Sequence, residues 1–248
     1  LCIGLDIDPD KLTNQKKYSV KDLESFSKNV VDWTIEICPV YKINVAFYER
    51  FGSKGIVWLE NLMIHINHRA IVIADAKRGD IGNTSLQYAR SIFDTMGFDA
   101  VTISPYMGRD SIIPFVQDRS KGAFVLALTS NPGAEDLQYH TESGMTLYQK
   151  VAAMVMELNE KNDNLGLVVG GTRPGLMEPL RKQTPGLSWL IPGIGAQGGD
   201  IKQSVTMGNK LGTGIINVSR GILYAGSSSE TDIRSTTENY TSEIQKYL

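Results

Sequence analysis

A short segment at residues 75–84, DAKRGDIGNT, gathers two carboxylates and a lysine directly after an apolar run. The run, Ala70–Ala74, is typical of a buried strand. Charged side chains are rarely buried unless they are paired. In extended backbone Asp75 and Lys77 point to the same side, because side chains alternate along a strand. The segment is therefore either a structural ion pair at a strand end or a charged site that acts on a ligand.

A second candidate site is the glycine-rich segment IPGIGAQGGD, residues 191–200. Its glycines allow backbone amides to approach a ligand closely. A helix is expected to begin near Gly199–Asp200, and its N-terminus would favour an anion. The next apolar run ends in NVSRG, in which Arg220 is a candidate for bidentate phosphate binding. The structural alternative is a tight turn plus a surface arginine.

Weaker signals lie elsewhere in the chain. Ser130 could offer a hydroxyl to a ligand, although the Asn-Pro-Gly that follows it forms a turn by its own chemistry. His65 and His68 are spaced three apart on a predicted helix, but no third ligand joins them, so a metal site is not expected. The sequence has no G-x-S-x-G, C-x-x-C or Walker loop.

The hydrophobic pattern predicts the elements that position these residues. Strands are expected at Cys2–Leu5, Val40–Val45, Ala70–Ala74, Ala100–Ile103, Ala123–Leu128, Leu165–Val169, Trp189–Ile191 and Gly214–Val218. A first helix should start at an N-cap, Ser19, with Asp22 three residues later. Further helices are expected at Gly52–Asn67, Asn83–Met96, Asp110–Asp118, Glu142–Asn162, Gly175–Arg181, Asp200–Met207 and Thr231–Tyr247.

Alternating strands and helices indicate an α/β protein with a parallel sheet. A closed (β/α)8 barrel, or TIM barrel, typically has about 250 residues, so we predict one such domain over residues 1–248. A doubly wound open sheet is the alternative, but no G-x-G-x-x-G follows the first strand. The barrel would hold its chemistry at the carboxyl ends of its strands, where the polar residues fall: Asp6, Lys42, Asp75, Lys77, Ser104, Ser130, Gly170, Pro192 and Arg220.

Composition excludes several classes of partner. The chain has 25 basic and 27 acidic residues, so its charge predicts neither a nucleic-acid nor a membrane partner. No apolar run approaches the ~20 residues that span a bilayer, and no signal-peptide pattern opens the sequence. Cys2 and Cys38 lie in apolar segments and are expected to be buried free thiols in a reducing compartment. A cytoplasmic globular protein is expected.

The motifs together resemble those of orotidine 5'-phosphate decarboxylases. DAKRGDIGNT is similar to the D-x-K-x-x-D-I-x-x-T signature of that family, and IPGIGAQGGD is similar to its phosphate and pyrimidine loop. LDIDPD, VYKINVAFYE, LTSNPG and INVSRGILYA occur in the expected order, and the longer bacterial branch of the family is the most similar. The resemblance implies a cofactor-independent carboxy-lyase that converts orotidine 5'-monophosphate to uridine 5'-monophosphate in de novo pyrimidine biosynthesis.

The resemblance also implies a role for each charged residue. Lys77 would donate the proton that replaces carbon dioxide, and Asp75 would lie against the substrate carboxylate. Lys42 would join this charged array, and Asp6 would bind the ribose. The family forms homodimers, in which Asp80, Ile81 and Thr84 would enter the partner's site.

The remaining residues would bind the pyrimidine and the phosphate. Ser130 would hold the pyrimidine, Gln197 would bridge it to the phosphate, and Arg220 would bind the phosphate. Pro192 is expected beside the substrate. Ser219 is a departure, because many members have glycine before the arginine, although a backbone contact to phosphate is still expected there. No metal ion is implied.

Two alternative functions are open. A sugar-phosphate decarboxylase or aldolase of the same superfamily shares D-x-K-x-x-D, but it needs magnesium and a glutamate near the second strand, where this chain has Lys42 and Asn44. A non-catalytic protein that binds nucleotide phosphates on the same barrel is the other alternative. The complete set of Asp75, Lys77 and Asp80 argues against it.

Overall fold

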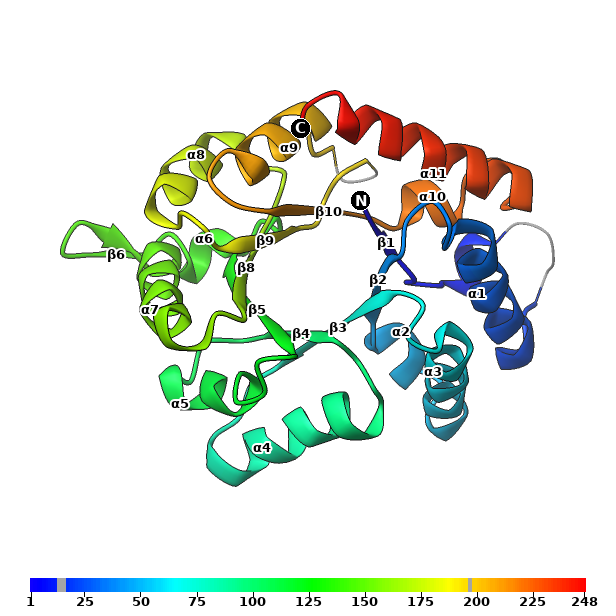
Figure 1. The fold of residues 1–248 in the computed structure, drawn as a ribbon, viewed down its shortest axis with the longest axis horizontal. Helices are drawn as coiled ribbons and strands as arrows, with labels where there is room; N and C mark the ends of the chain where they lie inside the picture. The colour runs from blue at the N-terminus through cyan, green and yellow to red at the C-terminus, as the bar shows by residue number, and fades with distance from the viewer. Residues whose placement is uncertain (13–16, 196–197) are drawn as a thin grey trace.

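Eight parallel strands close into a barrel surrounded by helices (Figure 1). The computed structural model describes residues 1–12, 17–195 and 198–248. The predicted TIM barrel is confirmed, and the open sheet is excluded because β1 pairs with both β2 and β10. In order around the barrel the strands are β1 (Cys2–Gly4), β2 (Val40–Asn44), β3 (Ile71–Arg78), β4 (Ala100–Ile103), β5 (Gly122–Leu128), β8 (Leu165–Val169), β9 (Ser188–Ile191) and β10 (Gly214–Val218).

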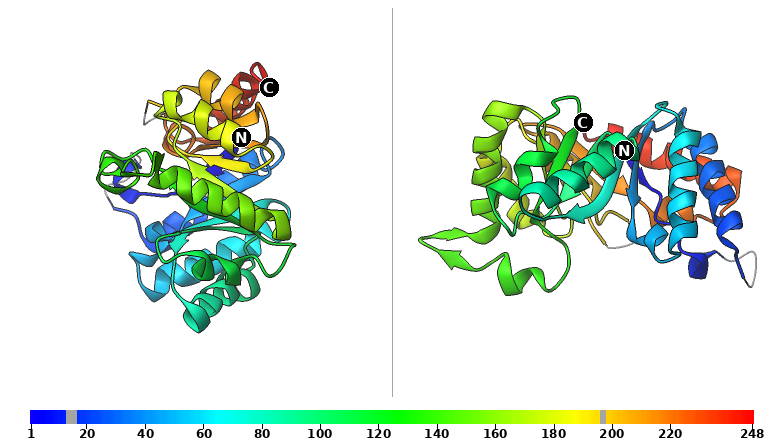
Figure 2. Two further views of the ribbon diagram at one scale, coloured as in Figure 1. Left: turned by 90° about the vertical axis from the view of Figure 1, so that its left-hand side faces the viewer. Right: turned by 90° about the horizontal axis from the view of Figure 1, so that it is seen from below.

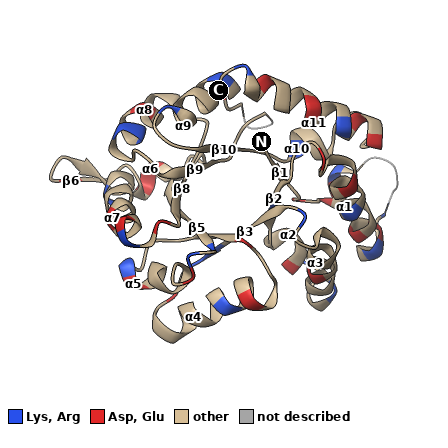
Figure 3. Cartoon of the chain, in the orientation of Figure 1, with Lys and Arg blue, Asp and Glu red and all other residues tan. Residues whose placement is uncertain are grey.

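The helices surround the barrel, and the longer ones bury apolar residues in the core between them and the strands (Figure 1). The α-helices are α1 (Val20–Thr34), α2 (Ala46–Glu49), α3 (Ser53–Ile66), α4 (Gly82–Arg90), α5 (Arg109–Ile112), α6 (Ala134–Leu137), α7 (Leu147–Asn162), α8 (Pro174–Gln183), α9 (Ile201–Asn209), α10 (Arg220–Leu223) and α11 (Glu230–Gln245). The predicted cap is confirmed, because Ser19 and Asp22 form a reciprocal capping box at the start of α1. Figure 3 shows both signs of charge interspersed along the outer helices. Among the described residues, no helix is long and apolar enough to cross a bilayer.

Three predicted helices differ from the observed ones. The helix predicted from Glu142 begins at Leu147, because β6 (Thr141–Glu142) and β7 (Met145–Thr146) form a hairpin that projects from the barrel (Figures 1 and 2). Its turn, Ser143-Gly144, has positive φ at both residues, as two-residue hairpin turns often do. The helix predicted at 83–96 changes to a π-helical turn after Arg90, and the one predicted at 110–118 tightens into a 3-10 turn at a proline.

Strand β3 is longer than predicted and irregular at its end. It continues past Ala74 to Arg78, and its pairing with β4 shifts register between these two residues. Lys77 has a φ of 47°, in the left-handed region that residues other than glycine rarely adopt. The first four residues of the charged segment, 75–78, are therefore part of the barrel wall rather than of a loop beyond it.

A buried arginine, Arg181, links helices and a strand in the part of the barrel formed by α8, α9 and β9. Arg181 on α8 is 1% exposed, and its guanidinium stacks 3.7 Å above the ring of Trp189 on β9. Its N–H groups donate to the backbone carbonyls of Thr184, Leu187, Met207 and Gly208. Burial lowers the pKa of Arg181 to about 10. Because helix ends leave carbonyls unpaired, this one side chain fixes α8, α9 and β9 around the glycine-rich segment.

Candidate active site

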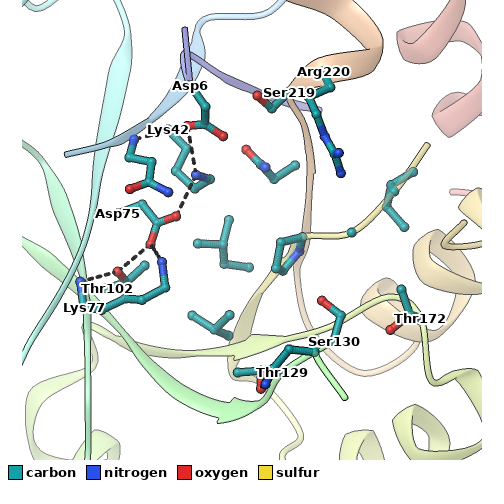
Figure 4. A pocket seen from close by; sticks show the side chains of 18 of the residues that line it. Asp6, Lys42, Asp75, Lys77, Thr102, Thr129, Ser130, Thr172, Ser219 and Arg220 are labelled. Atoms are coloured by element: carbon teal, nitrogen blue, oxygen red, sulfur yellow. Dashed lines mark hydrogen bonds and ion pairs between the residues drawn. The ribbon is translucent and has the colours of Figure 1, made fainter. Parts of the chain in front are cut away.

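A cavity of about 820 Å³ opens at the carboxyl ends of the strands (Figure 4). Most of the predicted ring of polar residues lines it, together with side chains that were not predicted. The predicted residues in its wall are Asp6, Lys42, Asp75, Lys77, Ser130, Pro192, Ser219 and Arg220. Gln197, the remaining predicted residue of the glycine-rich segment, lies outside the described residues.

The floor of the cavity is divided into a charged half and an apolar half. Lys42, Asp75 and Thr102 come from the neighbouring strands β2, β3 and β4. Across the barrel, β5, β8 and β9 contribute only hydrocarbon at this level, from Leu126, Val168 and Leu190. A flat, partly apolar ligand can therefore lie on one half while its charged group faces the other.

The charged half is an alternating array of ammonium and carboxylate groups. Asp75 lies at its centre, with Lys42 Nζ 2.8 Å from Oδ2 and Lys77 Nζ 2.6 Å from Oδ1. Lys42 also lies 3.6 Å from Asp6. The side chains of Lys42 and Asp75 are 4% and 12% exposed, whereas that of Lys77 is 50% exposed. Lys77 is thus the member of the array that can best meet a ligand.

The charges around Asp75 and Lys42 keep these two groups ionised. Burial opposes the charge of Asp75, but the ammonium groups of Lys42 and Lys77 outweigh it, so the pKa of Asp75 lies well below its usual range. Burial likewise disfavours the Lys42 ammonium, but Asp6 and Asp75 hold the pKa of Lys42 above its ordinary value. A fixed negative charge therefore stands in the cavity at neutral pH, between two fixed positive groups.

Thr102 on β4 is a site residue that sequence reasoning missed. Its hydroxyl donates to Asp75 Oδ1 at 3.0 Å and accepts from the backbone N–H of Lys77 at 3.0 Å. The sequence predicted only that it stands in the strand Ala100–Ile103, and no role was expected for it. The signal that could have found it is strand alternation. Thr102 stands two residues after Ala100, so both side chains lie on the same face of the strand, and Thr102 lines the cavity from that face.

A tyrosine holds the loop that carries Asp6. The hydroxyl of Tyr224, just after α10, accepts from the backbone N–H of Asp8 at 2.7 Å and donates to the carbonyl of Asp6 at 3.1 Å. Asp6 Oδ1 in turn accepts from the backbone N–H of Asn44. Burial raises the pKa of Tyr224 to about 12, so its proton is retained at neutral pH. Asp6 is therefore tied both to the segment that follows α10 and to the end of the second strand, β2.

Ser130 and Arg220 lie on the side of the cavity away from Asp75 (Figure 4), and Pro192 also lines the cavity. The Ser219 hydroxyl is buried and makes no hydrogen bond within the described part of the chain. A side chain at Gly4 would come within 2.6 Å of the Ser219 Cβ, so the serine depends on a glycine in the facing strand. Gln138 fixes the segment before Ser130 through the backbone and hydroxyl of Thr129.

The helix after the glycine-rich segment, α9, begins as predicted. The carboxylate of Asp200 caps it and accepts from the backbone N–H of Gln203 at 3.1 Å. One of the free amides at this helix end is therefore already paired, and whether the end favours an anion stays a prediction.

The second half of the charged segment points away from this cavity. Asp80 accepts a hydrogen bond from the next backbone N–H, that of Ile81, and does not line the cavity. Ile81 is 56% exposed, and Thr84 is also exposed at the start of α4. Within one chain the structure thus joins Asp75 to Lys77 but leaves Asp80, Ile81 and Thr84 outside the lining of the cavity.

No metal-binding cluster is found in the described parts of the chain: no three His, Cys, Asp or Glu side chains are arranged to hold an ion. His65, one of the two spaced histidines, instead contacts Asp32 at 2.8 Å. Cys2 and Cys38 are both buried free thiols, as predicted.

Comparison with known proteins identifies the family. A family model described as orotidine 5'-phosphate decarboxylase / HUMPS matches residues 1–233. The chain belongs to this family. It is 45% identical over 236 residues to an orotidine 5'-phosphate decarboxylase of Dehalococcoides mccartyi, covering 93% of this chain and 85% of the relative. It is 41% identical over 230 residues to that of Herpetosiphon aurantiacus, covering 92% and 85%.

Solved structures of the family share the same barrel. The structure of Leishmania donovani OMP decarboxylase superimposes with a TM-score of 0.87 at 35% identity, covering 99% of this chain and 92% of the other. The family match therefore extends over the whole barrel rather than over the charged segment alone.

Proposed function

We propose that this member of the family decarboxylates orotidine 5'-monophosphate to uridine 5'-monophosphate in pyrimidine biosynthesis, and that Lys77 is its proton donor. The observation that carries the proposal is the array of Lys42, Asp75 and Lys77 at the floor of the cavity. A fixed carboxylate between two ammonium groups suits a reaction in which one negative group leaves and a carbanion takes its place. The chain acts as a carboxy-lyase.

The divided floor fits the two parts of this substrate. The pyrimidine ring would lie on the apolar half formed by Leu126, Val168 and Leu190, and its carboxylate would face Asp75 and Lys77. When the carbon–carbon bond breaks, its electron pair stays on the ring carbon and neutral carbon dioxide departs. The Lys77 ammonium then transfers a proton to that carbon, and the lysine is left neutral until it is reprotonated.

The sizes of the two electrostatic effects show whether Asp75 or Lys77 contributes more to lowering the barrier. A carboxylate about 4 Å from Asp75 would be repelled by about 4 kcal/mol at an effective dielectric constant of ~20. Enzymes lower barriers by ~8–23 kcal/mol, so repulsion alone is insufficient. Attraction between the Lys77 ammonium and the developing carbanion must be the larger contribution, because it grows only as the bond breaks. Asp75 supports it by holding the ammonium in place before substrate arrives.

The rest of the cavity accounts for the sugar and phosphate. Asp6 and Lys42, which line the cavity, are proposed to bind the ribose, and Arg220 is proposed to bind the phosphate. Ser130, Pro192 and Ser219 are proposed to contact the substrate from the same wall, as is Gln197, which lies outside the described residues. Binding of the phosphate, remote from the reacting carbon, would contribute energy for positioning it.

We also propose a homodimer in which Asp80, Ile81 and Thr84 complete the partner's cavity. Two observations support it: these residues do not line their own cavity, and Ile81 is an exposed apolar side chain beside it. The chain is further proposed to act as one domain in the cytoplasm.

Mixed dimers test the shared site. Lys77→Ala and Asp80→Ala should each be inactive alone. After coexpression, half of the dimers are mixed, and each mixed dimer has one intact site, so roughly a quarter of wild-type activity is expected from the two-fold symmetry. If Asp80 served its own chain, both sites of a mixed dimer would carry a defect and no activity would return.

The function is tested by incubating the purified protein with orotidine 5'-monophosphate and following the ultraviolet spectrum, with the product identified by chromatography. Stoichiometric conversion to uridine 5'-monophosphate is expected. A protein that binds uridine 5'-monophosphate tightly without any turnover would instead be the non-catalytic alternative.

A further inference from the structure

The irregular end of β3 has a single partner on β4. Ala74 pairs with Val101 and Arg78 pairs with Ile103, so three residues of β3, from Asp75 to Lys77, lie opposite Thr102 alone. Such a bulge bends a strand and redirects its side chains. Here it brings the Asp75 and Lys77 side chains to one point, where Nζ meets Oδ1 at 2.6 Å.

The bulge leaves two groups that need a hydrogen-bond partner: the backbone N–H of Lys77 and one carboxylate oxygen of Asp75. The backbone N–H of Lys77 falls outside the regular ladder, and the residue holds a left-handed φ of 47° that costs about 1–3 kcal/mol for a residue with a side chain. The carboxylate of Asp75 can rotate about its last bond unless both oxygens are held. Lys42 holds Oδ2, which leaves Oδ1 to Lys77 and one further donor.

The Thr102 hydroxyl meets both needs at once. It accepts from Lys77 N at 3.0 Å and donates to Asp75 Oδ1 at 3.0 Å (Figure 4). A hydroxyl has one proton and two lone pairs, so these two bonds are compatible. The side chain is buried, with 1% exposure, which excludes water as a ready replacement. A valine of the same shape could form neither bond.

We propose that Thr102 is a positioning residue for decarboxylation, whose hydroxyl sets the placement of the Lys77 ammonium against the Asp75 carboxylate. The inference rests on the proposed function. Thr102 acts through these two residues, not on the reacting carbon. Its loss should therefore impair the chemical step more than the binding of a nucleotide that has no carboxylate.

The test compares Thr102→Val, which keeps the shape, with Thr102→Ser, which keeps the hydroxyl. Thr237→Val is the matched control, because Thr237 is a fully buried threonine on α11 that bonds within its own helix and does not line the cavity. The measurements are kcat for orotidine 5'-monophosphate, Kd for uridine 5'-monophosphate, and hydrogen exchange of the Lys77 amide.

For T102V we expect kcat to fall by about 10- to 100-fold, the range produced by slight misplacement of catalytic groups, with Kd for the product within about threefold. The Lys77 amide should exchange faster than in wild type. T102S should stay within about fivefold of wild-type kcat, and T237V should be unchanged.

A T102V enzyme with wild-type kcat, or a T102S enzyme as impaired as T102V, would overturn the proposal. Should T102V fail to fold, T102S and Thr102→Ala carry the same comparison. If the proposed function were wrong, the result would differ from failure of the Thr102 proposal. The wild-type protein would then show no turnover, but the Lys77 amide would still exchange faster in T102V than in wild type.

Discussion

Lys77→Ala is expected to lower kcat for orotidine 5'-monophosphate by at least about 10⁴-fold, because it removes both the proton donor and the charge that stabilises the carbanion. The side chain is 50% exposed toward the cavity, so its loss leaves no buried charge without a partner. Asp75 keeps Lys42 and Thr102 as partners. The fold should therefore persist, and the defect should lie in the chemical step.

Binding of product separates this role from general damage. Uridine 5'-monophosphate has no carboxylate to place against Asp75, so its Kd for the variant should stay within about tenfold of wild type. Lys54→Ala, an exposed lysine on α3, is the control for loss of a positive charge. Turnover by the Lys77→Ala variant within tenfold of wild type would show that another group donates the proton.

Asp75→Asn should have the second largest effect, on both activity and stability. The amide removes the negative charge that holds Lys42 and Lys77, and Lys42 is almost fully buried. Removal of one partner from a buried ion pair typically costs about 3–5 kcal/mol, and Asp6, at 3.6 Å, compensates only in part. We expect kcat to fall by at least about 10³-fold, because the Lys77 ammonium is no longer preorganised.

The stability difference should depend on pH in a defined direction. The pKa of Asp75 is lowered in the folded protein, so its stabilisation is complete above the unfolded pKa of about 3.9 and is lost as the pH falls toward the folded value. Unfolding in urea should thus show a large deficit for Asp75→Asn at pH 7 and a smaller one below about pH 4.

The pKa of Lys42 is raised, so its contribution to stability persists to about pH 10.4, the ordinary lysine value, and declines only at higher pH.

The control for Asp75→Asn is Asp94→Asn, at an exposed position of the π-helical turn, which should unfold like wild type. A deficit for Asp75→Asn that did not change with pH would mean that the residue stabilises the fold through packing rather than through charge.

The frame of the barrel could be predicted because its strands are buried on both faces. Strands such as Leu165–Val169 and Gly214–Val218 are mostly apolar runs, and their observed limits match the predicted ones. The capping box at Ser19 and Asp22 is likewise local chemistry. The ring of polar residues followed from the fold, since parallel strands in a barrel end on one face.

What could not be predicted depends on contacts between distant segments. The bulge in β3 exists because Thr102 on β4 satisfies it, and no pattern within residues 75–78 shows this. Arg181 was predicted only as the last residue of a helix, yet it is buried and donates to carbonyls of the segments around residues 184–187 and 207–208. The separation of Asp80 from Asp75 came from the family resemblance, because spacing alone suggested one cluster.

The most direct test of the central claim is the rate of orotidine 5'-monophosphate decarboxylation by the wild-type protein in excess metal chelator. Because the proposed chemistry uses only fixed charges and a lysine proton, we expect uridine 5'-monophosphate to form at an unchanged rate. Formation of no uridine 5'-monophosphate, or a rate that collapses with chelator and returns with magnesium, would contradict the account.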